Sequence, residues 1–144
     1  MKSVIELNPD VLLGASNEYI MATMYHEALH GYLHLEQKKL GAAAFNAKYP
    51  AVKVQPTAAD STKFSIDEGE YYTMVDGNHI KMAEYYTSGL VKAILAYNPN
   101  FPADRARVLA RAGIFELAPT EKTMNTAERT RSSTSVGQTC VITP

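Results

Sequence analysis

The sequence contains a single cysteine, Cys140, and no tryptophan. One cysteine excludes an internal disulfide and any zinc ribbon built from several cysteine ligands. Long apolar runs are also missing: none approaches the roughly 20 residues that a membrane-spanning helix needs. Residues 1–10 lack the basic start and apolar stretch of a signal peptide. The sequence therefore predicts a soluble protein without a membrane partner, cytoplasmic by default.

Neither sign of charge dominates the chain. It has 14 lysine and arginine residues against 15 aspartate and glutamate residues, which leaves a net charge of −1 at pH 7. A chain without excess positive charge has no overall field that draws it to nucleic acid or to an anionic membrane. The sequence thus carries no strong nucleic-acid signal, and it shows no basic groove of the kind that a DNA-linked protease needs.

The size of the chain limits it to one hydrophobic core. Its 144 residues are 46% hydrophobic and 20% charged, which suits one ordinary domain. From Pro119 onward the sequence is rich in threonine, serine and charge, with few residues to bury. We predict a folded domain at residues 1–118 and a polar, loosely ordered tail at residues 119–144. The oligomeric state is left open.

Two long helices dominate the predicted secondary structure. The first covers residues 16–39, with Ser16 or Asn17 as its N-cap and a glycine, Gly41, just after its basic end. The second covers residues 78–97, where apolar side chains recur every three or four positions. The two helices are expected to pack through Met21, Met24, Leu29, Leu33, Met82, Tyr86 and Leu90.

Smaller elements surround these helices. Residues 2–7 alternate in the manner of a short edge strand and are followed by a turn at residues 8–10. Residues 41–70 are mixed in character and predict a mobile insertion, and residues 102–112 predict a third helix. The predicted fold class is α+β and mostly helical, with a small sheet edge.

Three of the four histidines fall in the short stretch "MYHEALHGYLH", which lies inside the first long helix. His26 and His30 are four residues apart, so their imidazoles share a helix face and can converge on one ion. Glu27 lies beside them. In the pattern His-Glu-x-x-His on a helix, two imidazoles hold zinc and the glutamate takes a proton from a zinc-bound water. Apolar neighbours indicate that the histidines are partly buried and need partners.

A catalytic zinc usually has three protein ligands, so a third must be found. His34 lies about 12 Å from His26 along a continuous helix, too far to share an ion. The long metzincin motif also fails, because Leu33 and Glu36 occupy the places of its glycine and third histidine. His34 is therefore expected to be a solvated residue near the helix end.

His79, at the start of the second long helix, is the favoured third ligand. It shares a face with Met82 and Tyr86, so packing against the first helix would carry its imidazole inward. Glu84 is the main alternative, and its face of the helix differs from that of His79. Weaker alternatives are the two acidic residues in the preceding loop, Glu68 and Glu70.

The stretches "SVIELNPDVLLGASNEYIMATMYHEALHGYLH" and "DGNHIKMAEYY" resemble small zincin-fold metallopeptidases of the SprT-like and minimal gluzincin-like kind. The resemblance covers residues 3–97. It implies a zincin-like fold with an edge strand before the active-site helix. By that resemblance His26, His30 and His79 are zinc ligands and Glu27 is the general base.

The function implied is hydrolysis of peptide bonds in a peptide or protein substrate, through a zinc-bound water activated by Glu27. An oxyanion donor would also be needed, and the candidates are tyrosines that are equally typical of helix packing: Tyr71, Tyr72, Tyr85 and Tyr86. The alternative function is a binding module, zinc-stabilised or inactive, within a larger protein or assembly. A fourth protein ligand closing the zinc site would favour the module.

Overall fold

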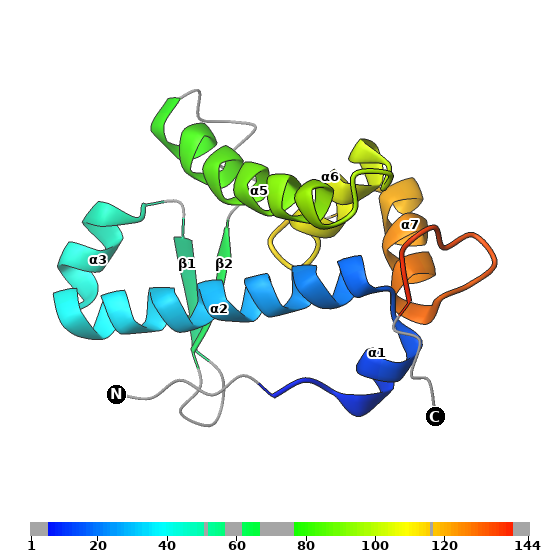
Figure 1. Ribbon diagram of the computed structural model, residues 1–144. Helices are drawn as coiled ribbons and strands as arrows, with labels where there is room; N and C mark the ends of the chain where they lie inside the picture. The colour runs from blue at the N-terminus through cyan, green and yellow to red at the C-terminus, as the bar shows by residue number, and fades with distance from the viewer. Residues whose placement is uncertain (1–5, 51, 57–61, 67–76, 116, 140–144) are drawn as a thin grey trace.

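The computed structural model describes residues 6–50, 52–56, 62–66, 77–115 and 117–139, with the backbone alone for residues 53–56, 62–66 and 77–85. Figure 1 shows the long helix α2 lying across the molecule, with α5 and α6 on one side of it. The elements in chain order are α1 (Pro9–Gly14), α2 (Asn17–Leu40), α3 (Ala42–Lys48), β1 (Val52–Pro56), β2 (Thr62–Ile66), α5 (Gly77–Tyr97), α6 (Ala103–Arg111) and α7 (Pro119–Thr130).

The predicted α+β zincin-like fold is wrong. The chain is mostly helical, and strand pairing among the described residues is confined to the antiparallel hairpin of β1 and β2, in which Val52 pairs with Ile66. That hairpin lies within the stretch predicted to be a mobile insertion, which also contains α3. Most of the predicted edge strand at residues 2–7 falls outside the described residues. The turn predicted at residues 8–10 is instead the start of α1, capped by the Asn8 side chain, which accepts from the Asp10 N–H at 2.9 Å.

The three predicted helices are confirmed, and α2 has the predicted ends. Ser16 is its N-cap, because its hydroxyl accepts from the backbone N–H of Tyr19 at 3.3 Å. Gly41 ends the helix with a φ of 75°, a conformation that residues other than glycine rarely adopt. Lys38 and Lys39 in the last turn also complement the helix dipole. The result is an uninterrupted 24-residue helix that carries the motif.

Two separate apolar clusters pack against α2. Towards its N-terminus, Ala22 joins a cluster built mainly from α5 and α6, whose buried members also include Leu90, Ile94, Phe101, Ala106, Leu109 and Ala110. Towards its C-terminus, Leu33 joins Phe45, Tyr49 and Val52 from α3 and the start of β1. Of the predicted packing residues, Leu33 and Leu90 are buried, whereas Met24 is 49% exposed because it points away from both clusters. Met82 lies outside the described side chains.

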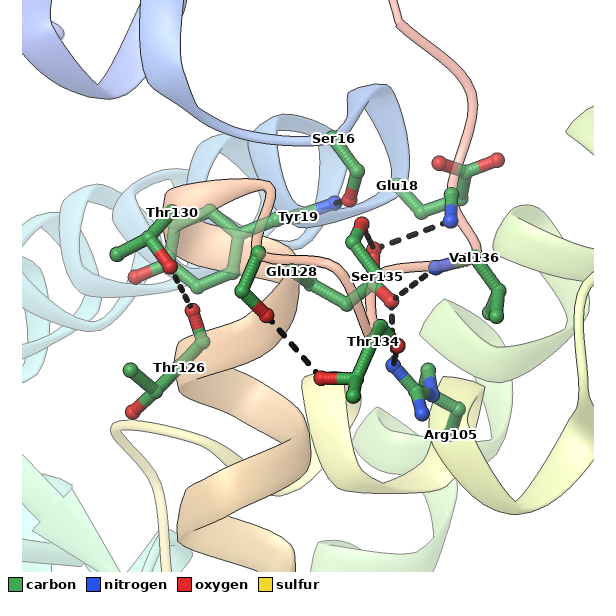
Figure 2. A network of polar contacts seen from close by, with 12 residues as sticks. Ser16, Glu18, Tyr19, Arg105, Thr126, Glu128, Thr130, Thr134, Ser135 and Val136 are labelled. Atoms are coloured by element: carbon green, nitrogen blue, oxygen red, sulfur yellow. Dashed lines mark hydrogen bonds and ion pairs between the residues drawn. The ribbon is translucent and has the colours of Figure 1, made fainter.

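Two buried carboxylates join distant parts of the chain near the start of α2 (Figure 2). Glu18 accepts from Asn98 Nδ2 at 2.6 Å and from the backbone N–H of Gln138 at 2.8 Å. Glu128, on α7, accepts from Arg105 at 2.7 Å. It also accepts from the Ser135 hydroxyl and from the backbone N–H groups of Val136 and Gly137. Both carboxylates have no exposed surface, so these donors replace the water that each would otherwise bind.

Residues 119–139 differ from the loosely ordered tail that the composition predicts. Residues 119–130 form α7, which contacts α1, α2 and α6. The segment after α7 then passes between α7 and the start of α2, where the Gln138 carbonyl accepts from the backbone N–H of Asn17 at 2.8 Å. This order comes from hydrogen bonds to buried carboxylates, so a scarcity of apolar residues in the segment does not preclude it.

Gly137 is required by this packing. A Cβ placed on it would lie 2.5 Å from Glu18 Oε2 and 2.6 Å from Glu128 Oε2, and would also overlap Ser16 Cβ. We expect Gly137→Ala to lower the free energy of unfolding by about 2 kcal/mol, as overpacking of a tight site does. Urea unfolding would measure the change. The matched control is Gly14→Ala, because a Cβ there meets nothing within 4 Å. Equal stability of the two variants would contradict the close packing at Gly137.

Candidate metal centre

His26 and His30 lie on α2 between its two apolar clusters. The helix brings their imidazoles together on one face, with ring centroids 4.3 Å apart and ring planes at 87°. Their Nε2 atoms face each other at 2.7 Å, with one ring as donor and the other as acceptor. The predicted convergence of these two side chains is therefore found in the structure. Two imidazoles whose Nε2 atoms lie this close could serve as two ligands of one metal ion, once the metal replaces the proton that they share.

The surroundings of His26 favour the neutral form of its ring by lowering its pKa. Burial is the main cause that lowers its pKa below the ordinary value of 6.5, and the neighbouring His30 imidazole lowers it further. Glu27 is close enough to oppose that shift, but its effect is smaller. A neutral imidazole has a free lone pair on one ring nitrogen, which is the form that binds metal.

Glu27 lies on a different face of α2 from the two histidines. It follows His26 directly, so its side chain lies about 100° further around the helix, and it is exposed. Its side chain is thus open to water, whereas the two imidazoles are half-buried.

The turn after α6 contacts the His26 ring. Ala112 ends α6, and Gly113 follows with a φ of 79°. Gly113 lies against the His26 ring. Gly113 was not among the site residues predicted from the sequence. The sequence shows only that Gly113 lies just past the end of the predicted helix at residues 102–112. That position indicates a C-cap and does not predict a contact with a histidine.

One atom of the pair has no hydrogen-bond partner. Nδ1 of His26 is buried and has none within the described part of the chain. In metal sites the second ring nitrogen of a ligating histidine usually donates to a carbonyl or carboxylate. The Nε2 atoms therefore fit a metal, whereas the described surroundings of Nδ1 do not supply this second interaction.

The described residues do not complete a metal site. They contain no group of three or more histidine, cysteine, aspartate or glutamate side chains that could hold a metal ion. His79 lies in the first turn of α5, but its side chain and that of Glu84 are outside the described part of the structure. Glu68 and Glu70 are also outside it. His34 is half-buried, so it is less solvated than predicted, and it remains two turns from His26 on the same helix.

No family model, characterised protein or solved structure that was compared with the chain matches it. Its function must therefore be inferred from the side chains themselves. Within the described residues, no helix combines the length and apolarity needed to cross a bilayer.

Tyr86 lies close to tyrosines of α2. Burial, followed by the proximity of Tyr32 and Tyr25, raises the pKa of Tyr86. Tyr32 is hydrogen-bonded through its hydroxyl to that of Tyr49 at 2.9 Å, and Tyr49 donates to Glu36 at 3.0 Å. Of the tyrosines considered as oxyanion donors, Tyr86 is half-buried among these rings, and Tyr71, Tyr72 and Tyr85 lie outside the described side chains.

Proposed function

We propose that this chain is a zinc-dependent metallopeptidase whose reaction centre lies on α2. The observation that carries the proposal is the His26 and His30 pair, with Nε2 atoms facing each other at 2.7 Å and an exposed Glu27 beside them. The proposal does not depend on a zincin fold. The geometry that it uses belongs to one continuous helix, which sets the spacing of the three side chains.

In this proposal His26 and His30 bind zinc through Nε2, and His79 is the third ligand. Bound zinc would act as a Lewis acid towards a water molecule and the scissile carbonyl. Glu27 accepts the proton of the attacking water and passes it to the leaving amine. The solvent exposure of Glu27 supports this role because both the water and the substrate must reach it.

The burial of the pair limits how its two imidazoles can be satisfied. Two neutral imidazoles that face each other can share only one proton between their Nε2 atoms, and Nδ1 of His26 is left buried without a described partner. An unpaired buried polar atom costs about 1–3 kcal/mol. Neither the hydrogen bond between the imidazoles nor a metal bond at Nε2 satisfies Nδ1.

Metal analysis tests the proposal directly. We expect the parent to hold one zinc ion per chain after it has been purified without added zinc and then dialysed against buffer that contains zinc. His79→Ala is expected to lose most of this zinc, because two imidazoles alone hold it weakly. Zinc at a hundredfold excess over its Kd should add about 2.7 kcal/mol to the free energy of unfolding, and a chelator should remove that gain.

His34→Ala is the control, since His34 lies about 12 Å from His26 along the helix and should leave the zinc content unchanged. A parent that takes up no zinc rules out the proposed function. If the parent and His79→Ala hold zinc equally well, His26 and His30 remain the proposed ligands and His79 is not a ligand. Zinc with four protein ligands would favour the binding module.

A further inference from the structure

We propose that Gly113 is a positioning residue for the candidate metal centre. The absence of a side chain at Gly113 leaves the space in which the His26 imidazole is held against His30. The inference rests on the proposed function, since it takes His26 and His30 as zinc ligands. Gly113 lies more than eighty positions after the motif in the sequence, and by this inference it affects how tightly zinc binds.

Gly113 is held in place by its own turn. The backbone N–H groups of Ile114 and Phe115 both donate to the Arg111 carbonyl, at 3.0 and 2.9 Å. Ile114 is only 8% exposed, so the turn is also anchored by burial. These contacts prevent the turn from retreating freely from α2.

A Cβ at Gly113 would press on the imidazole that is proposed to bind zinc. It would lie 3.0 Å from Cε1 of His26 and 3.3 Å from Nε2, which is tighter than nearly all real contacts of a Cβ atom. The His30 ring lies 4.3 Å away, centroid to centroid, and leaves little room for the His26 ring to move in that direction. The imidazole would have to shift by a few tenths of an ångström.

A shift of that size matters for a metal ligand. Bond lengths to zinc in proteins vary by only about 0.2 Å around their usual values, so displacement of one imidazole weakens the site. Loss of a neighbour that orients a metal-ligating histidine typically lowers metal affinity by about 10–100-fold. We expect an effect at the lower end of that range from Gly113, since it acts through contact and makes no bond to the ring.

The test compares Gly113→Ala with Gly41→Ala. Both glycines have a positive φ, 79° and 75°, so alanine is strained at either position. At Gly41, however, a Cβ meets nothing within 4 Å, and Gly41 ends the helix that carries the histidines. Gly41 also has a ψ of 163°, a region essentially confined to glycine, so Gly41→Ala carries severe backbone strain but lacks the contact with His26.

Zinc affinity is the readout, measured by competition with a chromophoric chelator, together with thermal unfolding of the metal-free proteins. Gly113→Ala is expected to bind zinc about tenfold more weakly than Gly41→Ala, although metal-free Gly113→Ala should melt no lower than metal-free Gly41→Ala. Asparagine tolerates the left-handed region better than alanine does. Gly113→Asn therefore replaces Gly113→Ala if that variant does not fold, and Gly41→Ala remains its comparison.

The results separate this inference from the proposed function. A parent that binds no zinc overturns both. A parent that binds zinc, with a Gly113 variant that binds it as tightly as Gly41→Ala does, overturns the role of Gly113 and leaves the proposed function standing. In the metal-free parent, an NMR cross-relaxation peak between the Gly113 Hα protons and the His26 Hε1 proton is also expected, and its absence would overturn the contact.

Discussion

Glu27→Gln is expected to reduce peptide hydrolysis by at least about a hundredfold while leaving zinc content and stability close to those of the parent. A general base typically accelerates a reaction by about 10²–10⁴-fold, and the amide of glutamine cannot accept the proton. Glu27 is exposed, so the substitution breaks no buried contact. Zinc should be retained because the proposed ligands do not include Glu27.

The measurement is the initial rate of cleavage of a mixed library of fluorogenic peptides by the zinc-loaded proteins. Glu36→Gln is the matched control, because Glu36 is on the same helix but pairs with Lys48 and Tyr49, away from the histidine pair. This control should cleave at the rate of the parent. If Glu27→Gln cleaves as fast as the parent, Glu27 is not the base. If the parent holds zinc but cleaves nothing, the chain is better described as a zinc-binding module.

The helices could be predicted because their signals are local. Ser16 and Gly41 each set the end of α2 that lies within one or two turns of them. The helix ends can therefore be predicted from neighbouring residues in the sequence. The pairing of His26 with His30 is predictable for the same reason, since a spacing of four residues places two side chains on one face. No tertiary contact needs to be known for either prediction.

The order of residues 119–139 could not be predicted from composition. Glu18 accepts from a backbone N–H that is 120 positions away, and Glu128 from residues 7 to 9 positions further on. Such contacts depend on where α2, α6 and α7 meet. Composition indicates only that the segment has few residues to bury, and it does not register buried carboxylates that order a polar chain through hydrogen bonds.

The fold class was wrongly predicted because the motif constrains one helix and nothing beyond it. The spacing of His26, Glu27 and His30 is the same whether the helix packs on a sheet or on other helices. In the described part of the structure α2 packs on α5, α6 and α3 and also contacts β2 of the short hairpin, so the motif is carried by a mostly helical arrangement. Gly113 was missed for a related reason: a C-cap glycine is a common local feature, and its contact with His26 exists only in the folded chain.

Glu128→Gln is expected to lower the free energy of unfolding by about 3 kcal/mol, which is the scale for breaking a buried ion pair by removing one partner. Glutamine has one oxygen in place of two and adds an NH₂ group that cannot accept from the surrounding donors. Arg105 and three backbone or hydroxyl donors would compete for that oxygen. Thermal unfolding at pH 7 should show a melting temperature roughly 10 °C below that of the parent.

The effect should also depend on pH in a definite direction. Burial alone would raise the pKa of Glu128, but the hydrogen bonds from Val136, Ser16, Arg105 and Ser135 outweigh it, and the pKa lies below the ordinary value of 4.5. The folded state therefore binds this proton less readily than the unfolded state does. The stabilisation by Glu128 is fully present above the unfolded pKa and is lost as the pH falls through the folded pKa. The difference in stability between the parent and Glu128→Gln should accordingly shrink below about pH 4.

The matched control is Glu121→Gln, on the same helix. Glu121 pairs with Arg111 at 2.8 Å, but the two side chains are 22% and 32% exposed, so water screens the pair. Its loss should cost less than about 1 kcal/mol. If both glutamine variants lose the same stability, burial does not strengthen the interactions of Glu128. If the parent and Glu128→Gln instead stay equally far apart down to pH 2, the loss in the variant is one of packing and the charge of Glu128 contributes nothing.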